Sequence, residues 1–215
     1  MTIATGTQPL SVALREETSK AHEATEGSDF MTRLIGGQLD DKAVAMYTGQ
    51  LWFVYDALER AVRSFVGSPI VDAFADPRLE RRDSLESDLQ EMLGDDWRDQ
   101  IKILPATAKY VGHLETLKTP EAAVAHHYVR YLGDVSGGQV ISARLQKAYG
   151  FGPEKVKFYD FSSVGKPVPF RRSYREALDN LELTAEQRAN LIAEAGTAFY
   201  LNLGVFVELK EAIAK

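Results

Sequence analysis

The sequence predicts an all-α protein built as one domain, and three observations support this. Apolar residues recur at intervals of three and four along most of the chain, as from Val44 to Val62. No segment alternates apolar and polar residues with the period of a strand. Glycine and proline fall mainly between the periodic segments, where helices end. We expect about eight helices, a flexible tail at residues 1–10 and a single domain over residues 11–215.

Capping residues and helix breakers place the boundaries of each element. Ser11 is the expected N-cap of a first helix over residues 12–26, and Asp40 is expected to begin the third helix. Thr184 and Gln187 form a capping signal for the last helix, which we expect to reach Lys215. The other expected helices cover residues 29–35, 77–93, 105–118, 120–149 and 170–181, with irregular loops at residues 158–161 and 166–169.

The composition limits the functions that the chain can have. It carries a net charge of −6, whereas a nucleic-acid-binding protein usually shows a basic excess. It has no cysteine, which excludes disulfides, Fe–S clusters and thiolate ligands and fits a reducing compartment. No run approaches the roughly 18 apolar residues of a membrane span, and the N-terminus lacks the pattern of a signal peptide. We therefore expect a cytoplasmic protein with neither a membrane span nor a nucleic-acid partner. We also expect a monomer, although the composition does not determine the oligomeric state.

A glycine-rich stretch lies inside the helix expected at residues 120–149. Gly133, Gly137 and Gly138 each cost about 1 kcal/mol relative to alanine in a helix interior. Glycine lets a helix bend, and it lets another body approach the backbone without meeting a Cβ atom. Gly133 and Gly137 are about one turn apart on one face, and the carboxylate of Asp134 lies between them. This pattern predicts either a close helix–helix contact or a bent helix that receives a flat ligand.

Polar residues around the glycines favour the ligand over the packing contact. Tyr128 and Arg130 precede the glycines, and Gln139 follows them. Buried polar groups need hydrogen-bond partners, which a groove between two helices does not supply in this number. A flat ligand lying on the bent helix would use all of these groups.

Histidine supplies the candidate metal ligands, and His22 is the strongest of the four in the chain. Glu26 follows four residues later, so the two side chains share a helix face. A metal-bound histidine usually has its second ring nitrogen held by a carboxylate, a carbonyl or water, and Glu26 suits this role. The chain has no Glu-x-x-His pair and no His-Glu-x-x-His motif, which argues against a di-iron carboxylate site and a zinc hydrolase. One supported histidine in an all-α protein fits a single axial position on haem.

The neighbouring pair His126 and His127 precedes the glycines by about two turns. We interpret His127 as a helix-packing or surface residue. No partner at ligand spacing supports a role in metal binding for either histidine.

A basic segment interrupts this acidic chain. Four basic residues occur between residues 162 and 175 without an acidic one: Lys166, Arg171, Arg172 and Arg175. Arg171 and Arg175 share a helix face, and arginine is well suited to bidentate carboxylate binding. Arg15 lies two turns before His22 on the same face, where a cation would reach the rim of a ligand centred on His22. The alternative interpretation is a solvated basic face.

These pieces together resemble the haem oxygenase family, and the resemblance extends from about Ser11 to about Leu209. The central run Arg130-Tyr-Leu-Gly-Asp-Val-Ser-Gly-Gly138 is highly specific. The other matching stretches are residues 17–26, residues 173–175 with 180–183, and residues 194–202. Positions 15 and 171 hold arginine where many members have lysine, which keeps the charge but changes the donor geometry.

The resemblance implies that haem lies between the first helix and the glycine-bearing helix. His22 would be the proximal iron ligand, supported by Glu26, and Gly133 and Gly137 would lie over the distal face. Asp134 would anchor a water chain that delivers protons on that side. The other implied site residues are Tyr55, Tyr128 and Arg130 in the distal network and wall, Arg15, Lys166, Arg171 and Arg175 at the propionates, and Gly138, Phe199 and Asn202 near the pocket.

The activity implied by the resemblance is the cleavage of haem at a meso carbon with O2 and electrons. Haem would be both substrate and cofactor, and the products would be biliverdin, CO and Fe²⁺, with iron acquisition as the purpose. No strand–glycine loop–helix unit for a nucleotide is expected, so an external reductase or ferredoxin is implied as the electron donor. Two alternatives remain: a helical protein that carries or stores haem without degrading it, and a cofactor-free helical interaction module whose glycines are packing sites.

Overall fold

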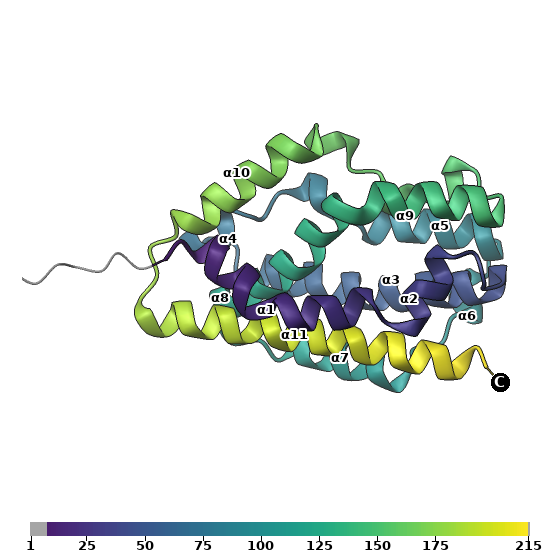
Figure 1. Ribbon diagram of the computed structural model, residues 1–215, viewed down its shortest axis with the longest axis horizontal. Helices are drawn as coiled ribbons and strands as arrows, with labels where there is room; N and C mark the ends of the chain where they lie inside the picture. Colours follow the sequence, from purple (N-terminus) through teal and green to yellow (C-terminus); the bar gives the residue numbers. More distant parts are fainter. Residues whose placement is uncertain (1–7, 215) are drawn as a thin grey trace, which may run out of the picture.

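The computed structural model describes residues 8–214 and is all-α over that range, as the sequence predicts. Figure 1 shows long helices packed along a common axis, with shorter helices at the ends. The α-helices are α1 Leu10–Glu26, α2 Asp29–Ile35, α3 Asp41–Ser64, α4 Pro69–Asp72, α5 Arg82–Leu93, α6 Trp97–Gln100, α7 Pro105–Glu115, α8 Pro120–His127, α9 Gly133–Tyr149, α10 Pro167–Asp179 and α11 Ala185–Ala212. A π-helix spans Tyr128–Leu132, and 3₁₀ turns span Pro77–Leu79, Pro153–Lys155, Lys157–Tyr159 and Ser162–Val164.

The start of α1 corrects one prediction. Pro9 occupies the N-cap position, and Leu10 is already helical, so Ser11 is not the cap. The backbone N–H and the hydroxyl of Ser11 donate instead to the carboxylate of Asp179, at 2.8 and 2.9 Å. This contact ties the start of α1 to the end of α10. The predicted tail boundary at residue 10 therefore falls inside the helix, and residues 1–7 lie outside the described part of the chain.

The caps predicted at Asp40 and Thr184 are confirmed, and Ser28 also caps its helix. The side chain of Ser28 accepts the N–H of Met31 at the start of α2, and Asp40 accepts the N–H of Ala43 at the start of α3. Thr184 and Gln187 form the reciprocal capping box that begins α11. Short polar side chains at these positions satisfy N–H groups that have no partner within the helix.

The loop expected at residues 166–169 is wrong, because α10 begins at Pro167. Proline fits the first turn of a helix, since its missing N–H would have no helical partner there. Of the loop expected at residues 158–161, residues 158 and 159 lie in a 3₁₀ turn, whereas residues 160 and 161 are irregular as expected. The four-residue helices α4 and α6 were not expected, because so short a segment shows no periodicity.

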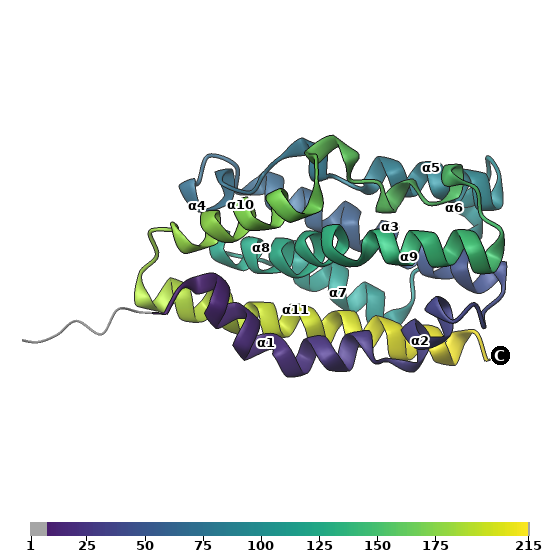
Figure 2. The ribbon, with the colours of Figure 1, turned by 45° about the horizontal axis from the view of Figure 1, so that its top comes forward.

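The longest helix, α11, forms the centre of the packing and contacts α1, α2, α7 and α8. Figures 1 and 2 both show it lying beside α1 along most of its length. Its buried residues include Leu191, Ala195, Ala198 and Leu209, each fully covered. Among the described residues, α11 alone is long and apolar enough to cross a membrane, although no such span was expected. The residues that α11 buries in the core account for part of that apolar composition.

The glycine-bearing segment is a helix in three pieces. The chain runs from α8 through the π-helix at Tyr128–Leu132 directly into α9. α8 packs against α11, and Figures 1 and 2 show α9 continuing from α8 toward the other end of the molecule. A π-helix interrupts the regular α-helical hydrogen bonds, which explains a change of direction without a proline. The predicted helix at residues 120–149 is therefore present with the predicted ends, but it is not one uninterrupted α-helix.

Candidate active site

A cleft of about 490 Å³ lies between α1, the π-helix, α9, α10 and α11. It brings together nine residues that the sequence singled out, which come from four separate stretches of the chain. They are Arg15, His22, Glu26, Tyr128, Gly133, Gly137, Arg171, Arg175 and Phe199. Thr18, Ser19, Glu23, Val129, Leu132 and Ser136 complete the lining.

His22 lies on the α1 wall of the cleft with its side chain half exposed. Its Nε2 atom lies 3.4 Å from Oε1 of Glu26, one turn further along the helix. The ring of Phe199 meets the imidazole edge-on, with the centroids 5.5 Å apart. One ring nitrogen is thus paired with a carboxylate and the other remains available, which is the arrangement that suits a metal-bound histidine.

Gly133 and Gly137 form a bare backbone surface on the other wall of the cleft. A Cβ atom built on either residue would meet no atom within 4 Å, so their faces are open. Gly138 differs, because a Cβ atom there would lie 3.2 Å from Cδ1 of Tyr159. The first two glycines therefore leave room for a ligand, whereas Gly138 allows α9 to pack closely against the segment that carries Tyr159.

Three arginines line one end of the cleft: Arg15 from α1, and Arg171 and Arg175 from α10. None of them forms an ion pair with another described residue. Burial raises the pKa of the nearby Tyr128, while the charges of Arg175 and Arg15 oppose the rise. By contrast, Arg172 points to Glu176, 3.8 Å away, and does not line the cleft. The cleft therefore offers unpaired guanidinium groups to an anionic ligand.

Behind the glycines, four predicted site residues form a hydrogen-bonded network outside the cleft. The hydroxyl of Tyr55 donates to Oδ2 of Asp134, and Nε of Arg130 donates to the Tyr55 oxygen at 3.2 Å. Arg130 also donates to Oδ1 of Asn202 at 2.9 Å and lies 3.7 Å from Oδ1 of Asp134. Burial raises the pKa of Asp134 well above its ordinary value, which favours the protonated form.

A family model described as heme oxygenase matches residues 8–208 of this chain. The chain belongs to the haem oxygenase family. The heme oxygenase of Porphyra purpurea is 38% identical over 205 residues, which cover 94% of this chain and 87% of that protein. Heme oxygenase 1 of Rattus norvegicus is 36% identical over 213 residues, covering 97% and 74% of the two chains.

Solved structures show the same fold. The crystal structure of heme oxygenase-1 from the cyanobacterium Synechocystis in complex with heme aligns with a TM-score of 0.91 at 33% identity. The alignment covers 96% of this chain and 95% of that one. The heme oxygenase of Leptospira interrogans aligns with a TM-score of 0.88 at 31% identity. The predicted fold class and family are thereby confirmed.

The residues lining the cleft fit haem, which is both substrate and cofactor in this family. One wall carries the imidazole of His22, which has one ring nitrogen without a partner among the described residues. The other wall carries Gly133 and Gly137, where no atom lies within 4 Å of the Cβ position. Unpaired guanidinium groups at one end match the charge of two carboxylates. A planar iron macrocycle with acidic side chains satisfies all three features at once.

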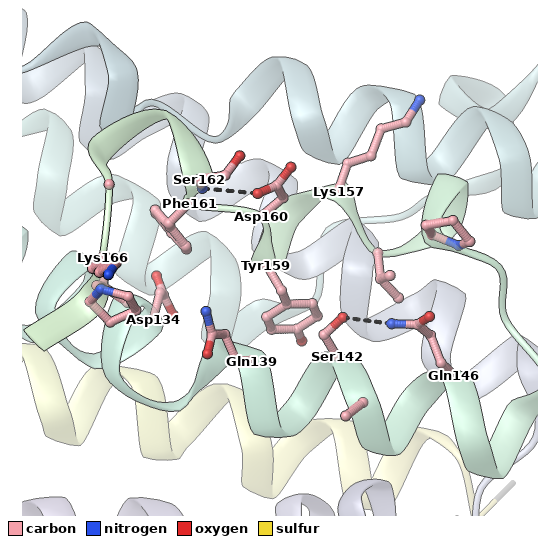
Figure 3. Close-up of a pocket in the computed structure, with 16 residues that line it drawn as sticks. Asp134, Gln139, Ser142, Gln146, Lys157, Tyr159, Asp160, Phe161, Ser162 and Lys166 are labelled. Carbon is pink, nitrogen blue, oxygen red and sulfur yellow. Dashed lines mark hydrogen bonds between the residues drawn. The ribbon is translucent and has the colours of Figure 1, made fainter.

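A second cavity of about 550 Å³ lies on another side of α9, between that helix and residues 153–167. Figure 3 shows Asp134, Gln139, Tyr159 and Lys166 around this cavity. Lys166 lines this cavity and not the haem-binding cleft, so its contact with a propionate stays a prediction. Asp134 has 14% of its side chain exposed, and it is the site carboxylate that this cavity reaches.

Two buried tyrosines near Asp134 were missed by the sequence. Burial raises the pKa of Tyr47 to about 12, and the Asp134 carboxylate contributes to the rise. Burial also raises the pKa of Tyr159 well above its ordinary value, with further contributions from Tyr47 and Asp134. Tyr47 belongs to the apolar stripe of α3, and Tyr159 lies in an aromatic loop segment. Both patterns indicate core packing, so nothing in the sequence connects these hydroxyl groups with Asp134.

The other three histidines lie away from the haem-binding cleft. His127 is buried, and its Nδ1 atom lies 2.8 Å from the hydroxyl of Tyr174, which supports the packing interpretation. His126 is completely buried in the last turn of α8. Its Nε2 atom lies 2.8 Å from Oε1 of Glu194, and His113 contacts the same oxygen. That convergence of three helices was not visible in the sequence.

Proposed function

We propose that this chain degrades haem in the cleft between α1 and α9, with His22 as the proximal iron ligand. The single observation that carries this proposal is the pairing of opposite walls: an available imidazole on one side and two open glycine faces on the other. Bound haem supplies the iron at which O2 is activated and the meso carbon that is oxidised. The residues of the chain bind and orient haem, and they supply the protons.

Glu26 would orient His22 by holding Nε2, which would fix the tautomer and leave Nδ1 as the nitrogen for the iron. A neutral imidazole donates less electron density to iron than a thiolate, and it therefore favours O–O cleavage less than the ligand of a P450 does. Phe199 packs against the edge of the imidazole and limits its rotation.

Asp134 holds a proton beside the distal wall and is the proposed source of protons for the reaction. Its raised pKa keeps the carboxyl group protonated under conditions where an exposed aspartate is charged. Tyr55, Arg130 and Asn202 fix its position through the hydrogen bonds described above. The second cavity gives water access to Asp134 from outside the haem-binding cleft.

Arg15, Arg171 and Arg175 orient the macrocycle by pairing with its carboxylates. They lie at one end of the cleft without ion-pair partners of their own among the described residues, so binding two carboxylates there breaks no existing ion pair. Holding the carboxylates would fix the rotation of haem in its own plane, and this rotation would decide which of the four chemically similar meso carbons is oxidised.

The electrons come from outside the chain, as the family implies. The described residues form helices only, so they contain no strand–glycine loop–helix unit that would bind a flavin or nicotinamide. We further propose that the working unit is a single domain over residues 11–215, acting as a monomer in the cytoplasm on a ferredoxin or reductase. Size-exclusion chromatography with light scattering tests the monomer.

Haemin titration followed by turnover tests the proposed function. The purified chain should bind one haemin with a Soret shift, and ascorbate or a reductase under O2 should then replace the Soret band with a bile-pigment spectrum. A ferrous-iron chelator should trap about one iron per haem. A stable Soret band under reducing conditions with O2 would instead identify a haem carrier or store. The absence of any Soret shift would identify a cofactor-free helical module and refute the proposal.

A further inference from the structure

A cluster of two histidines and a carboxylate lies outside the haem-binding cleft, and it plays no part in the proposed reaction. His113 comes from α7, His126 from α8 and Glu194 from α11. One potential ligand atom from each residue lies within 4.8 Å of the others. Nε2 of His113 and Nε2 of His126 lie 2.5 and 2.8 Å from the same oxygen, Oε1 of Glu194. We propose that this cluster binds a divalent transition-metal ion, with zinc as the ion that suits it best.

The donor set matches known zinc chemistry. Two imidazole nitrogens, one carboxylate oxygen and a water molecule form a four-coordinate zinc site. Ligand atoms about 2.1 Å from a tetrahedral zinc ion lie about 3.4 Å apart. The two nitrogens must therefore move away from Oε1 by less than about 1 Å. Rotation of the Glu194 side chain supplies that movement, since the side chain is 19% exposed and its carboxylate has no hydrogen-bond partner among the described residues besides the two histidines.

A supporting partner is already in place behind one ligand. The hydroxyl of Tyr110, which is fully buried, lies 3.2 Å from Nδ1 of His126. In the metal-free protein this hydroxyl donates to Nδ1, and Nε2–H donates to Glu194. With an ion on Nε2, His126 carries its proton on Nδ1, and Nδ1–H donates a hydrogen bond to the Tyr110 oxygen, because a hydroxyl can either donate or accept. Such a partner orients a metal-bound histidine and fixes its tautomer.

The surroundings allow an ion to enter and balance its charge. The side chain of His113 is 33% exposed, so the cluster opens to solvent, whereas that of His126 is completely covered. His113 lies in the last turn of α7, where backbone carbonyl groups favour a positive charge. Glu194 forms ion pairs only with the two histidines among the described residues, so no lysine or arginine competes for its carboxylate.

An ion bound here would link three helices, α7, α8 and α11, to one another. α11 contacts both α7 and α8, and it also carries Phe199, which lines the cleft. Ligands that bind only the folded state raise its stability in proportion to the logarithm of their concentration. The site therefore has the properties of a structural metal clasp, and it does not depend on the function proposed for the cleft.

Titration of the full-length, tag-free and haem-free chain with ZnCl2 in a non-chelating buffer tests the site. Calorimetry should show one ion per chain. Glu194→Gln and His113→Ala should each weaken zinc binding by at least about tenfold, because each removes one of three protein ligands. His22→Ala should leave zinc affinity within about twofold of wild type, since His22 and Glu26 form the other histidine–carboxylate pair in the described chain.

Two further measurements separate a built site from loose surface binding. Co²⁺ in place of zinc should give the intense visible absorption of four-coordinate cobalt, and this absorption should be lost in Glu194→Gln. Zinc added to the haemin-loaded chain should leave the Soret band unchanged. No zinc binding by wild type, equal binding by both cluster variants, loss of binding in His22→Ala, or the pale spectrum of six-coordinate cobalt would each overturn the proposal.

Discussion

Replacing Gly137 by alanine should have opposite effects on the haem-free and haem-bound protein. Gly137 is helical and lies in α9, and an added Cβ atom would meet nothing within 4 Å. Alanine is favoured over glycine in a helix interior by about 1 kcal/mol. The haem-free variant should therefore be more stable by about that amount, which corresponds to a rise in Tm of about 2–4 °C for a chain of this size.

The same methyl group should weaken haem binding, because Gly137 lines the cleft. An extra methyl group forced into a well-packed contact costs about 1–3 kcal/mol. The dissociation constant for haemin should rise by about 5- to 150-fold. Thermal unfolding of the haem-free protein and haemin titration of the folded protein measure the two effects separately.

Gly112→Ala is the matched control for this experiment. Gly112 lies within α7, has no atom within 4 Å of its Cβ position and does not line the cleft. It should raise Tm by a similar amount and leave haemin affinity unchanged. If Gly137→Ala lowers the Tm of the haem-free protein, the conclusion that the Cβ position of Gly137 is open is wrong. If it binds haemin as tightly as wild type, haem does not lie against this wall.

Three further predictions concern protons and charge. Asp134→Asn should retain haemin but lose most biliverdin formation. In wild type, the infrared carbonyl band of the protonated Asp134 carboxyl group should persist to a pH above the ordinary aspartate pKa, and activity should fall only as pH rises through the raised pKa. This band should be absent from the variant, and its loss in wild type at the ordinary aspartate pKa would contradict the assignment. Arg175→Ala should weaken haemin binding or change the biliverdin isomer ratio, whereas Arg172→Ala, which lies outside the cleft, should do neither. Burial lowers the pKa of His127 to about 3. As the pH falls below about 6.5, this histidine is therefore protonated in the unfolded chain but stays neutral in the folded chain. This residue should cost stability by up to about 1.4 kcal/mol per pH unit as pH falls from 6.5 towards 3, and an unchanged pH slope in His127→Gln would refute that assignment.

The fold was largely predictable from the sequence, because helix periodicity and capping are local properties. Asp40 and Thr184 cap their helices as predicted, since a side-chain oxygen there reaches an N–H two or three residues away. Ser11 was misassigned because its partner, Asp179, lies 168 residues further along the chain. The start of α10 was missed because Pro167 and Pro169 suggest a loop, whereas proline is equally acceptable in a first helical turn.

The site was predictable only in part, for a similar reason. The spacing of His22 and Glu26, and of Gly133 and Gly137, places each pair on one helix face, and the structure brings both pairs to one cleft. Spacing along the sequence does not show which residues pack against the other faces of these helices. The second cavity beside Asp134, which includes Lys166, depends on the path of residues 153–167 past α9, and no periodicity encodes that path.

The cluster of His113, His126 and Glu194 illustrates the limit most clearly. The sequence separates Glu194 from the two histidines by 81 and 68 residues. Ligand motifs are recognisable when their members lie on one helix or loop, and here each member comes from a different helix. Only the packing of α7, α8 and α11 brings the three together.

The π-helix at Tyr128–Leu132 also fixes where the rest of the glycine-bearing helix points. Such a segment arises when one residue is added to an α-helix, and each residue turns the helix by about 100°. Deleting a single residue there should restore regular winding and swing Gly133 and Gly137 about a quarter turn away from His22. The alignment of the two walls therefore depends on the number of residues in this segment as well as on their identity. A lineage that lost one residue here would have to rebuild its distal surface from other side chains.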